Sequence, residues 1–180
     1  MEYINRKPII YVLSGKAKSG KNTAADIIQN YYNDKKCVQV SFAYYLKQYV
    51  KKITNWDGLD ETKPRTLLQS LGIDLIKNKI DDKLLIRRTI EDIFVYSYFY
   101  DVIIITDARL IDEVEAIKNK FDKVITIRIN RSNYDNKLSL NEKNHITETN
   151  LDNYNNFDYI IENEEIEKKI LKIMEEIKWM

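Results

Sequence analysis

Residues 8–23 read PIIYVLSGKAKSGKNT, an apolar run followed by a turn with two glycines and then by a lysine. The run Ile9–Leu13 is typical of a buried strand, and the residues after Lys21 have a helical pattern. Gly15 and Gly20 allow backbone conformations that other residues rarely adopt, so successive N–H groups can turn inward around an anion. Together these features predict a phosphate-binding loop, the alternative being a purely structural strand–helix turn.

The predicted loop is expected to hold the phosphates of a nucleotide. The helix that follows it adds the positive end of its dipole, and Lys21 should reach the outer phosphates. We expect the Lys21 side chain to be exposed while the loop is empty. Asn22 stands where Ser or Thr usually holds magnesium, with Thr23 one residue later. The predicted phosphate-binding residues are Gly15, Lys16, Ala17, Lys18, Ser19, Gly20, Lys21, Asn22 and Thr23.

The bulk properties of the chain exclude several classes of partner. The chain has 180 residues, which suits one domain with a sheet covered on both faces. The balance of Lys+Arg 29 against Asp+Glu 28 does not indicate a nucleic-acid polymer or a membrane. Cys37 is the only cysteine, which excludes a disulfide within the chain. Neither a basic-then-apolar leader nor a membrane-length apolar run is found, so we expect a cytoplasmic protein.

Hydrophobic periodicity predicts that strands alternate with helices. Strands are expected over residues 8–14, 37–42, 101–106, 123–129 and 159–161. Helices are expected over residues 24–32, 43–53, 64–75, 82–98, 111–119 and 164–177, with Gly72 weakening the middle of the third. This order predicts a three-layer α/β/α fold with a mainly parallel five-stranded sheet, formed by one domain over residues 1–180.

Two segments are longer than the connections of a minimal fold of this kind. Residues 43–100 form a large, mostly helical insertion between the second and third strands. Residues 131–145 are polar and rich in asparagine, and they follow a strand whose end should lie beside the phosphate loop. A polar segment of this length is usually a lid or disordered, and its position favours a mobile lid.

Asp107 and Arg109 follow the third predicted strand. In open α/β sheets ligands bind at the carboxyl ends of the strands, so both side chains should face the crevice. Asp107 can hold the hydration shell of magnesium, and Arg109 can bind a phosphate through its guanidinium fork. The alternative is a local role, in which Asp107 caps nearby N–H groups.

Other candidate residues carry weaker signals. Arg65 and Gln69 lie four residues apart, so one helix face could present a cation to a phosphate and an amide to a base. Phe42 could stack on a base, although core packing is its default role. The lid is bracketed or filled by possible phosphate ligands, namely Arg128, Arg131, Lys137, Lys143 and His145. For His145 a capping or hinge role is an equal alternative.

Several motifs in sequence order resemble the deoxynucleoside monophosphate kinase family of phages and bacteria, within the wider P-loop nucleoside monophosphate kinases. They are spread over nearly the whole chain, at residues 15–23, 41–47, 65–72, 107–115, 145–148 and 157–163. The chain departs from the family pattern at Asn22, where Asp is typical, at Ala108, where Val is frequent, and at Tyr44-Tyr45, where Asp-Pro is frequent.

The resemblance implies transfer of the γ-phosphoryl group of ATP, with Mg²⁺, to a (deoxy)nucleoside 5′-monophosphate. It implies a catalytic set of Lys21, Arg109 and Arg131, and magnesium held by Thr23 and Asp107 through water. It places Asn163 beside the adenine of ATP, and the acceptor in the insertion against Phe42, Lys47, Arg65, Gln69 and Arg109. A nucleotide phosphate is already an anionic nucleophile, so no general base is needed.

Two other functions fit the same sequence signals. A kinase of another small phosphorylated acceptor, such as dephospho-coenzyme A or phosphomevalonate, would share the loop, Asp107 and the lid. A non-catalytic nucleotide sensor is favoured by Asn22 and by a lid poor in arginine. The base preference and the choice between ribose and deoxyribose do not follow from these residues.

Overall fold

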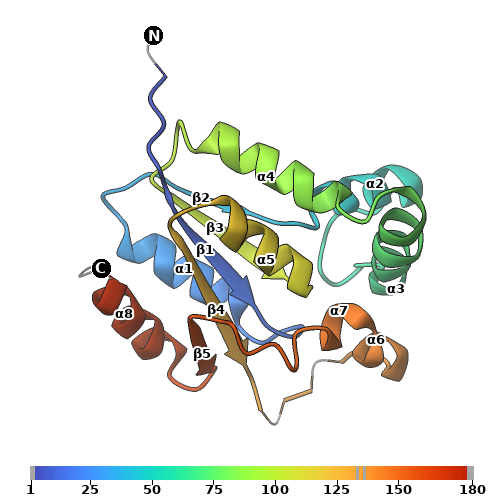
Figure 1. Cartoon of the computed structure of the whole chain (residues 1–180). Helices are drawn as coiled ribbons and strands as arrows, with labels where there is room; N and C mark the ends of the chain where they lie inside the picture. Colours follow the sequence, from blue (N-terminus) through green and yellow to red (C-terminus); the bar gives the residue numbers. More distant parts are fainter. Residues whose placement is uncertain (1–2, 133, 136, 178–180) are drawn as a thin grey trace.

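A computed structural model of the chain describes residues 3–132, 134–135 and 137–177, and it contains a five-stranded sheet (Figure 1). The strand order is β2-β3-β1-β4-β5, and every neighbouring pair is parallel. The strands are β1 (Ile9–Ser14), β2 (Cys37–Val40), β3 (Val102–Ala108), β4 (Val124–Asn130) and β5 (Tyr159–Glu162). The predicted fold class is confirmed.

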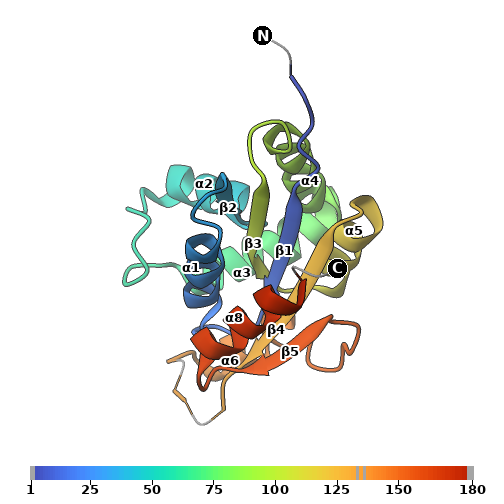
Figure 2. The same ribbon diagram turned by 90° about the vertical axis from the view of Figure 1, so that its left-hand side faces the viewer.

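Side chains of the central strand β1 alternate between two hydrophobic cores, as the pleat of a strand requires. Tyr11 and Leu13 pack with helices α1 (Lys21–Tyr31) and α8 (Ile166–Ile177). Ile10 and Val12 pack with helices α4 (Leu84–Tyr96) and α5 (Ile111–Lys120). Figure 2 shows the resulting layers, with α1 and α8 on one side of the sheet and α4 and α5 on the other. Because both faces are covered, the strands can be almost continuously apolar.

The insertion between β2 and β3 has a small core of its own. It contains helices α2 (Tyr44–Thr54), α3 (Arg65–Ser70) and η1 (Leu71–Ile80), followed by α4. Leu46, Val50, Leu68 and Ile76 form a separate buried cluster between the first three. Within the predicted insertion 43–100, α4 packs on the sheet, whereas α2, α3 and η1 project away from it (Figure 1).

The third predicted helix differs from expectation in length and winding. Residues 71–80 continue α3 directly as a π-helix and end five residues beyond the predicted limit. Its wider turns change the spacing of the apolar side chains, so a search for the α-helical period does not follow it. Gly72 lies against α2, where an added Cβ would approach Cδ2 of Leu46 to 3.1 Å.

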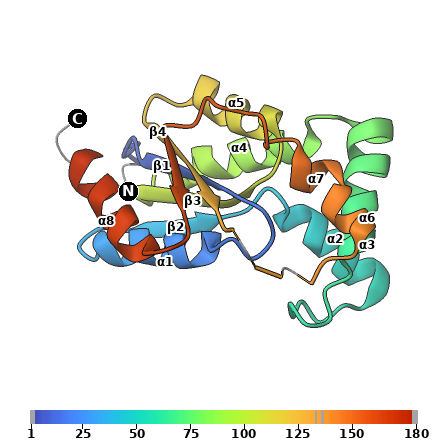
Figure 3. The same cartoon turned by 90° about the horizontal axis from the view of Figure 1, so that it is seen from below.

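The polar segment 131–145 contains regular structure near its end. Ser139 and Glu142 form a capping box that begins helix α6 (Leu140–Asn144), and helix α7 (Ile146–Thr149) follows directly. Figure 3 shows α6 and α7 beside α3, far along the chain from them. Within the described ranges, no helix has the length and apolar character needed to cross a membrane.

Candidate active site

The turn between β1 and α1 has the backbone geometry of a phosphate-binding loop. Gly15 and Gly20 have φ angles of 152° and 107°, and Lys18 between them also has a positive φ. A Cβ at Gly15 would lie 2.5 Å from the carbonyl oxygen of Ile129 in the neighbouring strand β4. The first glycine is therefore required both by its backbone angle and by the close approach of β4.

Lys21 is buried within the loop, contrary to the expectation that it would be exposed. Its side chain is folded back over the turn, where Nζ donates hydrogen bonds to the carbonyl oxygens of Gly15 at 2.8 Å and Lys16 at 2.7 Å. Burial lowers the pKa of Lys21, and the nearby Arg109 lowers it further. An ammonium group has three N–H donors, so one remains for a phosphate after these two bonds.

A carboxylate that sequence reasoning missed lies directly against this loop. Glu148 of α7 is buried, and its Oε2 accepts the backbone N–H of Ala17 at 2.9 Å. Its Oε1 accepts a hydrogen bond from Nη1 of Arg109 at 2.5 Å. Ala17 and Glu148 are 131 residues apart, so only the folded chain reveals this contact.

Arg128 lies on β4, before the segment 131–145 that it was predicted to bracket, and its role toward phosphate stays a prediction. Its buried guanidinium donates to Ser14 Oγ at 3.0 Å and to Asp152 at 3.1 Å. Asp152 also pairs with Lys16 of the loop at 2.8 Å. Arg128 thus supports the phosphate loop through Ser14 at the end of β1 and through Asp152, which pairs with Lys16.

Asp107 is engaged in local hydrogen bonds at the end of β3. It accepts the backbone N–H groups of Phe42 at 2.8 Å and Ala43 at 3.2 Å, together with the hydroxyl of Ser41 at 2.5 Å. These contacts fix the junction between β2 and α2, as the capping alternative predicted. Asp107 is also close enough to Lys21 to raise its pKa, so a role toward magnesium stays a prediction.

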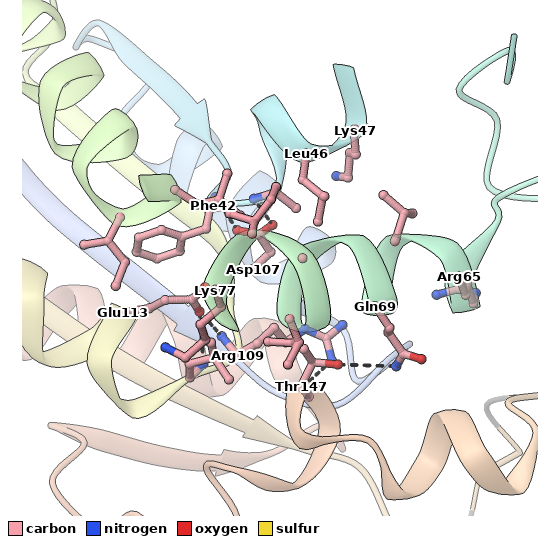
Figure 4. Close-up of a pocket in the computed structure, with 18 of the residues that line it drawn as sticks. Phe42, Leu46, Lys47, Arg65, Gln69, Lys77, Asp107, Arg109, Glu113 and Thr147 are labelled. Atoms are coloured by element: carbon pink, nitrogen blue, oxygen red, sulfur yellow. Dashed lines mark hydrogen bonds between the residues drawn. The ribbon is translucent and has the colours of Figure 1, made fainter. Parts of the chain in front are cut away.

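A cavity of about 200 Å³ opens between the end of β3 and the helices of the insertion (Figure 4). The structure brings together in its wall all five residues predicted to bind the acceptor: Phe42, Lys47, Arg65, Gln69 and Arg109. Phe42 also belongs to the core beneath the cavity. The remaining wall is largely apolar, with contributions from Leu46, Leu68, Ile73, Ile76 and Leu85. Glu148 lines the same cavity and also accepts the N–H of Ala17, so the rim of the cavity lies next to the phosphate loop.

Glu113 is a second buried carboxylate that the sequence did not single out. It lies in the first turn of α5, and its Oε2 accepts the backbone N–H groups of Arg109 at 2.7 Å and Leu110 at 3.0 Å. Burial raises the pKa of Glu113 to about 8, despite these hydrogen bonds. A glutamate at the third position of a predicted helix is the sequence signal that could have found it.

The predicted lid touches both the phosphate loop and the insertion. Nη1 of Arg131 donates to the carbonyl oxygen of Lys18 at 3.1 Å, and its guanidinium lies 4.9 Å from the ring centre of Tyr134. The Tyr134 hydroxyl donates to the carbonyl oxygen of Ala17. Leu138 is buried and lines the cavity. Residues 133 and 136 of the lid lie outside the described residues.

The other lid residues are placed less directly against the site. Lys137 and Lys143 are exposed, and no ion pair within the described ranges uses either side chain. His145 caps α7, because its Nδ1 accepts the N–H of Thr147 at 3.3 Å. Gln69 of α3 donates to Thr147 Oγ1 at 3.3 Å, so it bridges to α7 as well as lining the cavity (Figure 4).

The remaining predicted residues surround the beginning of α1. Asn22 and Thr23 are exposed in its first turn. Asn163, after β5, donates through Nδ2 to the carbonyl oxygen of Ser19 at 2.9 Å and lies against Gly20. This places Asn163 beside the loop, on the side away from the acceptor cavity, while its predicted contact with adenine stays a prediction.

The strand order and the lysine-containing loop define a P-loop kinase fold, with a small-molecule cavity beside the loop. The chain belongs to the deoxynucleotide monophosphate kinase family, whose model matches residues 32–173. The match begins after residues 15–23, so the loop is assigned by its own geometry. Family and fold together identify a phosphotransferase that acts on a small substrate.

Similar solved structures share the fold at low sequence identity. Shikimate kinase from Aquifex aeolicus aligns with a TM-score of 0.54 and 18% identity, covering 95% of this chain and 99% of that one. The protein TT1252 from Thermus thermophilus aligns with a TM-score of 0.54 and 12% identity, covering 93% of this chain and 96% of that one. No curated protein matches the chain.

Proposed function

We propose that the protein transfers the γ-phosphoryl group of ATP to the phosphate of a (deoxy)nucleoside 5′-monophosphate, giving ADP and the nucleoside diphosphate. The observation that carries this proposal is the position of Arg109. It lines the cavity of the insertion, and through Glu148 it is hydrogen-bonded to the phosphate loop. A guanidinium at this junction can hold an acceptor phosphate beside the donor phosphates of ATP.

The cavity offers both an anion-binding rim and an apolar wall. Lys47 and Arg65 line it, and no ion pair in the described part of the chain neutralises either side chain. These cations give the cavity a charge that suits an anionic acceptor, whose phosphate Arg109 would hold at the end beside the loop. The apolar wall suits a flat nucleobase, and Gln69 can offer its amide to the base edge if the contact to Thr147 opens.

The chemistry requires little covalent work from the protein. An acceptor phosphate oxygen is already an anionic nucleophile, so catalysis depends on alignment and on charge stabilisation. Lys21 and the loop amides stabilise the charge on the donor phosphates, and Arg109 aligns the acceptor. Arg131, held at the loop by Lys18, would add a cation from the lid side.

Magnesium would arrive with ATP, and the residues present fit that arrangement. Magnesium usually keeps several waters and binds one or two carboxylates together with substrate phosphates. The described residues contain no cluster of three His, Cys, Asp or Glu that would form a cage. Asp107 near Lys21 would hold the ion through water, with Thr23 at the start of α1, and the ion would neutralise phosphate charge.

A panel of acceptors tests this function. ADP release from ATP should be measured with each ribo- and deoxyribonucleoside monophosphate, with dephospho-coenzyme A, with phosphomevalonate and with shikimate. We expect at least one nucleoside monophosphate to accelerate ADP release well above the acceptor-free rate. If only a compound that is not a nucleotide accelerates ADP release, the cavity binds a different class of acceptor. ATP binding without any stimulated release would indicate a nucleotide sensor.

A further inference from the structure

Glu148 links the phosphate loop to the acceptor cavity, but the phosphoryl transfer described above gives it no role of its own. Its side chain is only 7% exposed. One carboxylate oxygen accepts the Ala17 N–H at 2.9 Å, and the other accepts Nη1 of Arg109 at 2.5 Å. A single carboxylate therefore joins the backbone of the donor loop to the arginine that faces the acceptor.

The segment that carries Glu148 is anchored on both sides. Before it, Thr147 accepts a hydrogen bond from Gln69 of α3 through its hydroxyl at 3.3 Å. After it, Asn150 accepts the backbone N–H of Ile111, at the start of α5, at 2.7 Å. These contacts tie α7 to the insertion and to the sheet layer at once. The carboxylate is thereby held at a fixed position, which suits a residue that sets a distance.

The charges around Glu148 show what it balances. Lys21, Arg109 and Arg128 lie close enough together to interact. Burial lowers the pKa of Lys21, and the positive charges of Arg109 and Arg128 lower it further. The carboxylates of Glu148 and Asp107 raise the pKa of Lys21. Glu148 therefore supplies a counter-charge that offsets part of the repulsion between Arg109 and Lys21.

We infer that Glu148 is a positioning residue for phosphoryl transfer, whose carboxylate fixes the Arg109 guanidinium relative to the phosphate loop. This inference rests on the proposed function, because it assumes that Arg109 aligns an acceptor phosphate. The position of the arginine matters because misplacement of a reacting group by about 1 Å can cost ~100-fold in rate. Glu148 itself need not touch either substrate.

The substitution Glu148→Gln tests this role with little change in volume. A glutamine can accept only one of the two hydrogen bonds, because its NH₂ group would face a second donor. The link between Ala17 and Arg109 is then broken at one end. We expect kcat/KM for the acceptor to fall by roughly 10- to 100-fold. The Kd of ATP without acceptor should change less than this, since Lys21 keeps its hydrogen bonds to the carbonyl oxygens of Gly15 and Lys16.

A double-mutant cycle with Arg109→Ala separates positioning from a general structural effect. If Glu148 acts through Arg109, Glu148→Gln should cost less than about twofold in kcat/KM once Arg109 is absent. Effects of the two substitutions that simply multiply would overturn the inference. Unchanged kcat/KM in Glu148→Gln alone would also overturn it. A wild-type protein that phosphorylates no acceptor would instead overturn the proposed function, and this inference with it.

Two further variants guard against a trivial loss of folding. Asp158→Asn removes a carboxylate that also accepts a backbone N–H, that of Thr126 at 2.7 Å, outside the cavity. It should leave acceptor kinetics unchanged. Glu148→Asp keeps the charge but shortens the side chain, so it should lower kcat/KM in the same direction as Glu148→Gln. If thermal melting shows that Glu148→Gln is unfolded at the assay temperature, Glu148→Asp decides: wild-type kcat/KM in that variant contradicts positioning.

Discussion

At the scale of single residues, Lys21 shows how the loop is organised for a ligand. Two of its three N–H donors are used by the carbonyl oxygens of Gly15 and Lys16, and its side chain is buried. The ammonium is therefore held over the turn by the backbone of the loop itself. This arrangement reduces the ordering that binding must impose on a long and flexible side chain.

Replacing Lys21 should remove catalysis far more than folding. In Lys21→Met the stem stays and the charge is lost, so kcat should fall on the order of 100-fold or more because transition-state charge is no longer stabilised. Lys172→Met is the matched control, since Lys172 is exposed on α8 and lines neither the loop nor the cavity. Steady-state ADP release at saturating ATP measures both. A kcat for Lys21→Met near that of the wild type would contradict the role of the loop.

Arg109 is expected to act on the acceptor and not on ATP. Arg109→Ala should raise the acceptor KM and lower kcat, because the guanidinium both binds and aligns the nucleophilic phosphate. Arg65→Ala, at the far rim of the cavity, should raise the acceptor KM with a smaller effect on kcat. Calorimetric titration of ATP alone should give a nearly unchanged Kd for both variants. Loss of ATP binding with intact acceptor binding would show that the two sites are assigned the wrong way round.

The predictability of the site follows from how local each interaction is. The loop, Asp107 and Arg109 were predicted because a strand end and a glycine-rich turn can each be recognised from a few consecutive residues. Glu148 lies in the family-like motif 145–148, but its role depends on a contact across 131 residues, so the motif alone did not show what the carboxylate binds. Lys21 was expected to be exposed because sequence reasoning did not foresee that the loop carbonyls would hold it.

At the scale of elements, the first turn of α5 shows how a buried carboxyl group is accommodated. Glu113 accepts the backbone N–H groups of Arg109 and Leu110, which orients the chain as it leaves β3. Burial raises the pKa of Glu113 from its ordinary value of 4.5 to about 8. The folded protein therefore keeps this carboxyl protonated at pH values where the unfolded chain ionises it.

This difference predicts a pH dependence of stability. Between about pH 4.5 and 8 the folded state binds one proton more than the unfolded state at Glu113, so the free energy of unfolding should fall as pH rises. The slope is up to about 1.4 kcal/mol per pH unit, and it levels off above pH 8. Urea unfolding of the wild type and Glu113→Gln at several pH values measures it. The difference between the two cancels other titrating groups, and a difference independent of pH would contradict the assignment.

The lid is the second element with a distinct expectation. Arg131 and Tyr134 contact the phosphate loop, and the carbonyl oxygen of Glu142 accepts a hydrogen bond from Gln69 at 3.4 Å, so the segment 131–145 contacts both sites. Its amide hydrogen exchange should slow when a bisubstrate analogue joining ATP to a monophosphate is added, while Ile9–Leu13 stays protected throughout. Equal exchange with and without the analogue would indicate a fixed loop.

The length of the lid should also control the fate of the γ-phosphoryl group. A variant with residues 132–138 replaced by a short Gly-Ser turn should transfer less phosphoryl group to the nucleotide and hydrolyse proportionally more ATP, because water enters the open site. The ratio of nucleoside diphosphate to inorganic phosphate measures this change. An unchanged ratio would remove the lid from the mechanism.

Elements were predicted well where one periodicity dominates and poorly where tertiary packing decides. All five strands were foreseen within a few residues, because strands covered on both faces read as short apolar runs between breakers. The π-helix at residues 71–80 was not foreseen, since its side chains follow neither the helical nor the strand period assumed. Helix α6 was also missed, although Ser139 followed by Glu142 is a capping-box pattern.

At the scale of the whole molecule, two binding regions meet at one edge of the sheet. The phosphate loop follows β1, Arg109 follows β3, and the insertion closes over the edge from the β2 side. Parallel strands bring their carboxyl ends together, so residues distant in sequence converge on one crevice. The order of the strands was not deducible from periodicity, and it is this order that places Arg109 next to the loop.

The central claim is direct transfer from the loop to the cavity, and labelled ATP tests it most directly. ATP carrying a labelled γ-phosphate should be incubated with the wild-type protein and the best nucleoside monophosphate of the acceptor panel, with Lys21→Met as the inactive control. The account predicts that the label appears in the nucleoside diphosphate, in equal amount to the ADP formed. Label found only as inorganic phosphate, or remaining in ATP in the presence of every monophosphate, would contradict it.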